Sequence, residues 1–384
     1  MKLLYLGFNR RYINRTSEVL LNSLARDHDL LYYGPGYVSP SELELGPEAW
    51  CDLHGPFDIV LFDSYVLEWD SVARRGRPFV GDYLMFPASD FYRWGMQLQA
   101  FAISTSGAKI FIANWDTYGI SENQISLIYQ ASCFVLDSQL GTWTIAEKEE
   151  IFGQPIQGFE GSGFWSRAND NWITFLKANR KLVLSIPHAI GTDQFCETPT
   201  AARPDRLAIP GTSYPERKNL YPLLTATQRA VKLARAVQDR VYFLRHDSLT
   251  LSKMQSIHAR YDGDITRARL AYVSGWLFRS PVRKYLEVPA LGAAPVGQRC
   301  EGFKELGFAD RQSFIVAESS SDVETALNDL DVEYVQQVAS QARRMVEANH
   351  SGRARADQLS ESIRRIVSGS FFGSYWQDGS YCHW

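Results

Sequence analysis

The chain alternates short runs of apolar residues with longer segments whose apolar positions recur at helical spacing. In its first half the runs are Lys2–Leu6, Leu30–Tyr33, Phe57–Asp63, Lys109–Ala113, Cys133–Leu136 and Lys181–Ile186. The helical segments are Thr16–Arg26, with Leu20, Leu21 and Leu24 on one face, and Glu122–Gln130. Because strands that alternate with helices pair in parallel, this half predicts a parallel sheet covered by helices on both faces.

The same alternation restarts after Thr198–Pro204, a stretch rich in Thr, Pro and Ala that is typical of a linker. The predicted strands are Arg206–Ile209, Val241–Leu244, Leu270–Val273, Ala294–Val296 and Phe314–Ala317. The predicted helices are Glu216–Val237, Pro281–Leu291, Asp322–Leu330, Glu333–Ala348 and Arg353–Val367. The fold class is therefore α/β, with two doubly wound, Rossmann-like domains expected to face each other across a cleft. We predict an N-terminal domain over 1–195, a C-terminal domain over 205–365 and a C-terminal tail over 366–384.

Composition agrees with a globular protein, since 45% of the 384 residues are hydrophobic and 22% are charged. The five cysteines are scattered and never spaced as CxxC, which favours a reducing compartment and provides no metal or disulfide framework. The first apolar run is too short for a signal peptide, and no apolar run is long enough for a membrane span. We expect a cytoplasmic protein without a transmembrane segment, with peripheral membrane contact as the alternative.

The net charge of −3 conceals an asymmetry between the two halves. Residues 1–190 hold 15 Lys and Arg against 21 Asp and Glu, whereas residues 191–384 hold 25 against 22. A polyanion such as DNA would bind poorly to the acidic half, so nucleic acid is a disfavoured partner. A small molecule that carries phosphate would prefer the basic half.

The most informative segment runs from Arg279 to Val296. Pro281 suits the first turn of a helix, and Glu287 follows Arg283 and Lys284 by about one turn, so these three can share a face. This pattern resembles the donor-binding segment of GT-B glycosyltransferases. The resemblance implies that Glu287 accepts hydrogen bonds from the ribose hydroxyls of a nucleotide sugar. The alternative is a surface carboxylate that pairs with Arg283 or Lys284.

A second segment, Leu207–Asn219, combines a strand, a turn at Gly211 and basic residues at the start of a helix. Backbone N–H groups and an Arg side chain at such a turn favour phosphate. The segment resembles the first strand–loop–helix of the GT-B C-terminal domain. The resemblance implies that Arg217, and next to it Lys218, hold the diphosphate of the donor. The alternative is a solvated helix face.

A third segment places Asp116 just after the strand Lys109–Ala113. A carboxylate there could take the proton of an acceptor hydroxyl. The segment is similar to the lysine-led strand of phage DNA β-glucosyltransferases, which ends in a catalytic aspartate. Further short likenesses to those enzymes lie at Gly211–Arg217 and Arg283–Glu287. The alternative for Asp116 is an aspartate that caps a turn.

Three further residues are weaker candidates. His188 lies where the chain of GT-B enzymes crosses between domains, His246 could face the leaving phosphate, and Glu160 lies in a glycine-rich loop that could border the acceptor. Three D-x-D pairs begin at Asp27, Asp262 and Asp329, and we expect them at element junctions or, for the second, in a loop. Their number is near chance, so we predict no metal site. The motifs GxGxxG, GxxxxGK[ST], GxSxG and HExxH are absent from the sequence.

Retaining GT-B families often carry a second glutamate eight positions before Glu287, and Arg279 stands there instead. This departure favours inversion with Asp116 as base, the alternative being retention with the leaving group steered by Arg217 and His246. We predict metal-independent transfer of a sugar from a nucleotide sugar, with UDP or GDP expected, to a hydroxyl of a glycan or other acceptor, as in polysaccharide biosynthesis. No further cofactor is implied. The rival hypotheses are DNA-base glucosylation, a non-catalytic nucleotide- or sugar-binding protein, and a sugar-phosphate epimerase.

Overall fold

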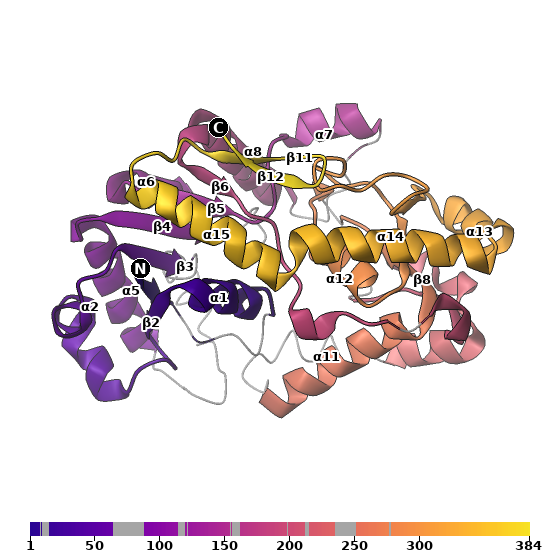
Figure 1. Cartoon of the computed structure of the whole chain (residues 1–384), viewed down its shortest axis with the longest axis horizontal. Coiled ribbons are helices and arrows are strands. Elements are labelled where there is room, and N and C mark those ends of the chain that lie inside the picture. The colour runs from indigo at the N-terminus through magenta and orange to yellow at the C-terminus, as the bar shows by residue number, and fades with distance from the viewer. Residues whose placement is uncertain are drawn as a thin grey trace. The chain divides into compact units, whose positions relative to one another are not determined.

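The computed structural model describes residues 1–7, 9, 15–63, 88–113, 120, 122–153, 155, 162–197, 199–211, 215–234, 251–275 and 278–384. The chain divides into two compact units (Figure 1). Unit 1 comprises Met1–His188, Arg355–Tyr375 and Tyr381–Trp384, and unit 2 comprises Ala189–Ala354 and Trp376–Ser380. The division falls at His188 and again at Ala354, within the last helix of the chain.

Unit 1 is built on a six-stranded sheet of order β2-β1-β3-β4-β5-β6. Its strands are β1 (Lys2–Leu6), β2 (Asp29–Tyr33), β3 (Ile59–Asp63), β4 (Ala108–Ala113), β5 (Phe134–Asp137) and β6 (Val183–Ser185). All neighbouring pairs are parallel. The carboxyl ends of the strands therefore share one edge, where such sheets bind ligands.

Helices cover both faces of this sheet, since the side chains of each strand alternate between two apolar clusters. One cluster joins the sheet to α1 (Arg15–Asp27) and α15 (Gly352–Val367). The other joins it to α2 (Pro40–His54), α5 (Ala88–Ser104), α6 (Glu122–Ala131) and α8 (Ser162–Ala178). The N-terminal sheet is thus completed by a helix from the C-terminal end of the chain, α15.

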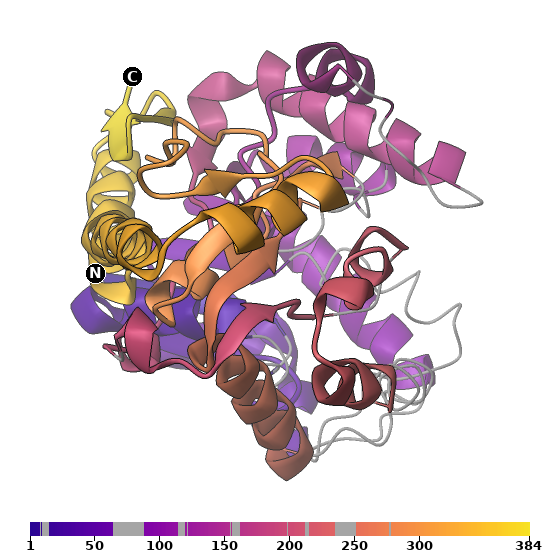
Figure 2. The ribbon, with the colours of Figure 1, turned by 90° about the vertical axis from the view of Figure 1, so that its right-hand side faces the viewer.

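Unit 2 contains a four-stranded parallel sheet of order β10-β9-β8-β7 (Figure 2). Its strands are β7 (Asp205–Ala208), β8 (Ala268–Val273), β9 (Ala294–Gly297) and β10 (Ile315–Val316). One apolar cluster joins these strands to α13 (Ser320–Asp329) and α14 (Val332–His350). The remaining described helices of this unit include α9 (Pro215–Lys218), α11 (Leu251–Thr266) and α12 (Lys284–Ala290). The predicted α/β class with two parallel sheets is confirmed.

Three local predictions are wrong. The long helix expected over Glu216–Val237 is broken, because α9 ends at Lys218 and a short 3₁₀ turn with Pro222 near its start precedes the helix over 226–234. Asp262 and Asp264 lie in α11 and not in a loop. The segment predicted as a tail forms a two-stranded hairpin of β11 (Ser374–Gln377) and β12 (Ser380–His383).

The hairpin turn has a cause that is visible in the sequence. Asp378 and Gly379 both have positive φ, at 48° and 82°, which matches the Asp-Gly pair favoured in two-residue hairpin turns.

Several helices of the structure were not predicted from the sequence: α2, α5, α7 (Ile145–Phe152), α8 and α11. Within the described part of the chain, no helix is long and apolar enough to cross a membrane. The predicted strand Val241–Leu244 lies outside the described residues.

Candidate functional site

The turn after β7 brings the backbone at Gly211 next to two cationic side chains. Gly211 has φ +85°, a conformation that favours glycine. A Cβ atom at this position would lie 2.5 Å from Nζ of Lys284 and 3.4 Å from Nη1 of Arg217. Gly211 is therefore required both by its backbone conformation and by the close approach of Lys284.

A third cation reaches the same turn from the helix over 226–234. Nζ of Lys232 donates a hydrogen bond to the carbonyl oxygen of Gly211 at 2.7 Å. We call Arg217, Lys232 and Lys284 the cationic cluster. Its members come from three separate helices, and they meet beyond the carboxyl end of β7, the edge at which parallel sheets bind ligands.

Arg217 is the most deeply buried member of the cationic cluster, with 2% of its surface exposed. Its Nη2 lies 3.4 Å from Oγ of Ser274, which directly follows β8, and its Nε lies 3.8 Å from Oε1 of Glu216. The guanidinium is thereby placed between the ends of two adjacent strands. A planar guanidinium in such a position can bind two oxygens of a phosphate at once.

The environment of Lys284 is unfavourable for its positive charge. Burial lowers the pKa of Lys284 well below 10.5, and Arg217 and then Lys232 lower it further, while Glu287 and Glu216 oppose the shift. Like charges held together in a desolvated site repel one another, and a bound anion would relieve that repulsion. The cationic cluster is therefore a physically plausible site for an anion.

Glu287 lies beside the cationic cluster on α12 and is buried, with 8% exposed. Its Oε1 lies 3.0 Å from Nε of Arg283, one helical turn earlier, and its Oε2 accepts a hydrogen bond from the hydroxyl of Tyr261 at 2.8 Å. Arg283 in turn donates to Oε1 of Gln194 at 2.6 Å. The carboxylate is thus held from two helices, α11 and α12.

Arg279, at the position where retaining families often carry a glutamate, is also buried, with 4% exposed. Its Nη1 donates to Oε2 of Glu318 at 2.7 Å and to the carbonyl oxygen of Arg299 at 3.2 Å. Its φ of 51° is rare for a residue with a side chain. Glu318 also pairs with Nε of Arg299 at 3.1 Å, so the two arginines share this carboxylate.

Of the other predicted site residues, the structure describes Lys218 and His188 only. Lys218 is exposed on α9, next to buried Arg217. His188 ends the first segment of unit 1, and its carbonyl oxygen accepts a hydrogen bond from Nη2 of Arg355 at 3.1 Å. Asp116, Glu160 and His246 lie outside the described residues. Their predicted roles stay predictions.

Three neighbours of the site were missed by reasoning from the sequence: Lys232, Tyr261 and Ser274. Lys232 was predicted to lie on the same long helix as Arg217, whereas the structure places it on a separate helix. Tyr261 lies on α11, a helix that was not predicted. Neither residue belongs to a local motif.

Within the residues that the structure describes, no three His, Cys, Asp or Glu side chains are grouped so that they could hold a metal ion.

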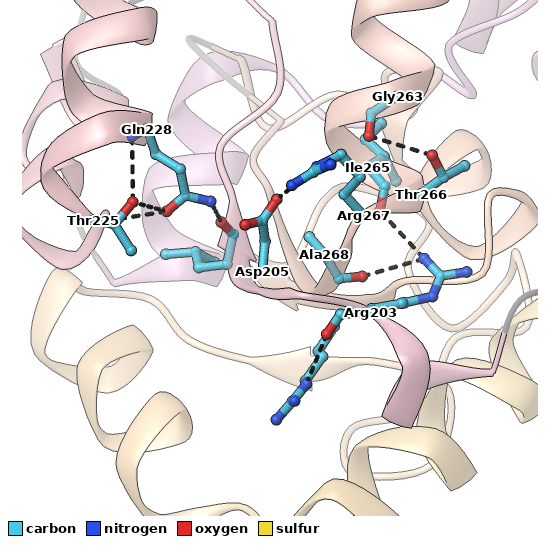
Figure 3. A network of polar contacts seen from close by, with 11 residues as sticks. Arg203, Asp205, Thr225, Gln228, Gly263, Ile265, Thr266, Arg267 and Ala268 are labelled. Atoms are coloured by element: carbon cyan, nitrogen blue, oxygen red, sulfur yellow. Dashed lines mark hydrogen bonds and ion pairs between the residues drawn. The ribbon is translucent and has the colours of Figure 1, made fainter.

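Another buried arginine, Arg203, lies at the opposite, amino end of the same sheet, and Figure 3 shows it from close by. Nη1 of Arg203 donates to the carbonyl oxygens of Ile265 and Ala268, both at 3.2 Å, and its Nη2 donates to that of Leu291 at 2.9 Å. These carbonyls belong to the end of α11, the start of β8 and the residue after α12. Arg203 therefore links the elements that carry Tyr261 and Glu287.

Comparison with known families identifies the part of the chain that holds Glu287. Residues 265–361 match a family described as glycosyl transferase-like. This part of the chain is therefore similar to glycosyltransferases. The matched segment contains Arg279, Arg283, Lys284 and Glu287, and the predicted resemblance of this segment to glycosyltransferases is confirmed. No curated protein sequence matches the chain.

Several solved structures are similar to this chain over almost its full length. HepE of Anabaena, solved in complex with UDP and glucose, is 10% identical, with a TM-score of 0.49, and the match covers 95% of this chain and 99% of HepE. A glycosyltransferase from Rickettsia africae is also 10% identical, with a TM-score of 0.49, and the match covers 96% of this chain and 99% of that chain.

Proposed function

We propose that this protein is a glycosyltransferase that uses a nucleoside-diphosphate sugar and binds its diphosphate at the cationic cluster. The observation that carries the proposal is the meeting of Arg217, Lys232 and Lys284 at Gly211. Three cations from separate helices are unlike a solvated helix face, because they converge on one turn of the backbone. UDP and GDP sugars are the donors expected first.

The charges at the site suit a diphosphate. The charge of Arg283 is balanced by Glu287, and Arg279 shares Glu318 with Arg299. The cationic cluster and Glu216 together then carry a formal charge of +2 when Lys284 is protonated. Each esterified phosphate carries about one negative charge, so a sugar diphosphate would balance the site.

The same cations would act in the chemical step. The bond between the anomeric carbon and the diphosphate oxygen breaks, the acceptor oxygen bonds to that carbon, and the acceptor proton passes to a base. The negative charge that grows on the departing nucleoside diphosphate is stabilised by Arg217, Lys232 and Lys284. Such preorganised charges usually supply the largest part of the rate enhancement.

Glu287 is suited to hold the ribose of the donor. An ionised carboxylate offers about four acceptor sites; the hydroxyl of Tyr261 occupies one on Oε2, and Arg283 forms an ion pair with Oε1. Acceptor sites remain on both oxygens for the hydroxyls of a ribose. The burial of this carboxylate, with 8% exposed, supports a role in the proposed donor site over that of a surface carboxylate.

For the acceptor we propose a hydroxyl of a glycan or another carbohydrate-bearing molecule, in a reducing compartment. The five cysteines of the chain are all free thiols, which supports this compartment. Asp116 is the proposed base for an inverting reaction, on the sequence pattern alone. The retaining alternative uses Arg217 and His246 to steer the leaving group.

The proposal is tested by thermal shift with UDP, GDP, dTDP, ADP and CMP. A ligand that binds only the folded state stabilises it by about 2.7 kcal/mol at a hundredfold excess over its Kd. We expect one nucleoside diphosphate to raise the unfolding midpoint, and Arg217→Met and Glu287→Ala to remove most of that shift. The matched control is Arg343→Met on α14, whose Nη2 pairs with Glu197 away from the site and whose shift should equal that of the wild type.

Two outcomes would contradict the proposal. If no nucleotide shifts the midpoint, or if Arg217→Met shifts like the wild type, the cationic cluster is not the donor site. Release of UDP from a UDP-sugar in the absence of acceptor then separates an enzyme from a binding protein. An enzyme hydrolyses the donor slowly, whereas a binding protein leaves it intact.

A further inference from the structure

Tyr261 contacts the proposed ribose-binding carboxylate from α11, a helix that was not predicted from the sequence. Its hydroxyl donates to Oε2 of Glu287 at 2.8 Å, while Arg283 lies against Oε1 at 3.0 Å. The two partners approach different oxygens from different helices, α11 and α12. The orientation of the carboxylate is therefore restricted by one partner at each of its two oxygens.

The helix that carries Tyr261 is linked to α12 through Arg203. The carbonyl of Ile265, one turn after Tyr261 on α11, accepts a hydrogen bond from buried Arg203, and the same guanidinium binds the carbonyl of Leu291 just after α12. Arg283 is oriented in turn by Gln194. Burial first, and Glu287 second, raise the pKa of Tyr261 well above 10, so its hydroxyl remains a donor at neutral pH.

We propose that Tyr261 is a positioning residue whose hydroxyl orients Glu287 so that its remaining acceptor sites face the two hydroxyls of a ribose. The terminal torsion of a glutamate is broad and roughly two-fold, so a carboxylate held by Arg283 alone samples other planes. Because Tyr261 orders the carboxylate of Glu287 before the ligand arrives, the entropy cost of ordering it is removed from the free energy of binding. The inference rests on the proposed donor site and adds that the site selects ribonucleotides over nucleotides that lack the 2′ and 3′ hydroxyls.

The test compares Tyr261→Phe with the wild type by calorimetric titration of UDP and of 2′,3′-dideoxy-UDP. We expect the variant to bind UDP about tenfold more weakly, the effect of losing one hydrogen bond to a charged group, and to bind dideoxy-UDP unchanged. The control is Tyr334→Phe on α14, which removes a hydroxyl that donates to the carbonyl of Arg311 at 2.9 Å. The affinities of this control for UDP and for dideoxy-UDP should stay at the wild-type values.

A positioning role requires that Tyr261 act through Glu287. The double variant Tyr261→Phe/Glu287→Ala should therefore bind UDP no more weakly than Glu287→Ala alone. Equal weakening of UDP and dideoxy-UDP by Tyr261→Phe, or additive losses in the double variant, would overturn the inference in favour of a merely structural tyrosine. Wild-type affinity for UDP in Tyr261→Phe would also overturn it.

The failure of this inference is distinguishable from the failure of the proposed function. If Arg217→Met loses both UDP and dideoxy-UDP while Tyr261→Phe binds like the wild type, the donor site stands and the role of Tyr261 falls. If the wild-type protein binds neither ligand and Arg217→Met changes nothing, the donor site falls, and the role of Tyr261 falls with it.

Discussion

The two ends of the sheet in unit 2 each bury an arginine, but they surround it differently. Arg203, at the amino end, is 1% exposed and donates to three backbone carbonyls. Arg217, at the carboxyl end, is 2% exposed and lies with Lys284 and Lys232 around Gly211. The two guanidiniums are equally buried, so burial alone does not tell which of them serves binding.

The difference lies in what compensates each charge. Backbone carbonyls are permanent acceptors, so the interactions of Arg203 are complete when the chain folds. Cations held close together repel one another, and a bound anion would relieve that repulsion, so we propose that the cationic cluster interacts with a ligand. We infer that the amino end contributes to stability and the carboxyl end contributes to binding.

The largest expected effect is on stability at the amino end. Arg203→Met should lower the free energy of unfolding by about 3 kcal/mol, because three buried carbonyls lose their donor. Urea denaturation followed by circular dichroism measures this loss, with Arg343→Met as the control expected to change stability by less than about 1 kcal/mol. Arg217→Met should leave stability unchanged or raise it slightly. An equal loss in the two buried arginine variants would break the comparison.

A glycine at the carboxyl end sharpens the comparison with an intermediate effect. Gly211→Ala forces a side chain into φ +85° and against Nζ of Lys284, so we expect a loss of about 1–2 kcal/mol in stability and weaker UDP binding. The control is Gly263→Ala on α11, where a Cβ would meet nothing within 4 Å and should stabilise the helix by up to about 1 kcal/mol. If Gly211→Ala binds UDP like the wild type, Lys284 is not needed at its observed position.

The smallest effect is the pH dependence of the carboxyl end. The pKa of Lys284 is lowered on folding, first by burial and then by Arg217, so the unfolded chain holds more protons between that lowered value and about 10.5. Stability should therefore rise with pH across this window, and Lys284→Met should flatten the rise. Urea denaturation at a series of pH values measures it.

UDP binding should show the opposite sign. A bound diphosphate favours the charged form of Lys284, so binding takes up a proton and weakens as pH rises through the window. Calorimetric titration in buffers of different ionisation enthalpy measures that uptake. If the wild type shows none, or if Lys284→Met shows as much, the charge of Lys284 is not linked to the ligand.

Much of the fold was predictable because buried parallel strands are nearly continuous apolar runs. β1 was predicted at its observed bounds, and β4 and β9 within one residue. The helix after Gly211 was predicted too long, since a local pattern of apolar positions does not show that Pro222 begins a new turn. The Asp378–Gly379 turn carried a usable pattern that the prediction of a tail overlooked.

The sequence by itself determined the α/β class, the resemblance to glycosyltransferases and the two segments that hold Gly211, Arg217, Arg283, Lys284 and Glu287, because these depend on residues that are close along the chain. Only the tertiary structure decided that Lys232 joins Gly211, that Tyr261 holds Glu287 and that α15 completes the sheet of unit 1. Those contacts join residues separated by 21 positions, by 26 positions and by almost the whole chain. No periodicity or motif encodes such pairs, because their proximity is set by the packing of helices on a sheet.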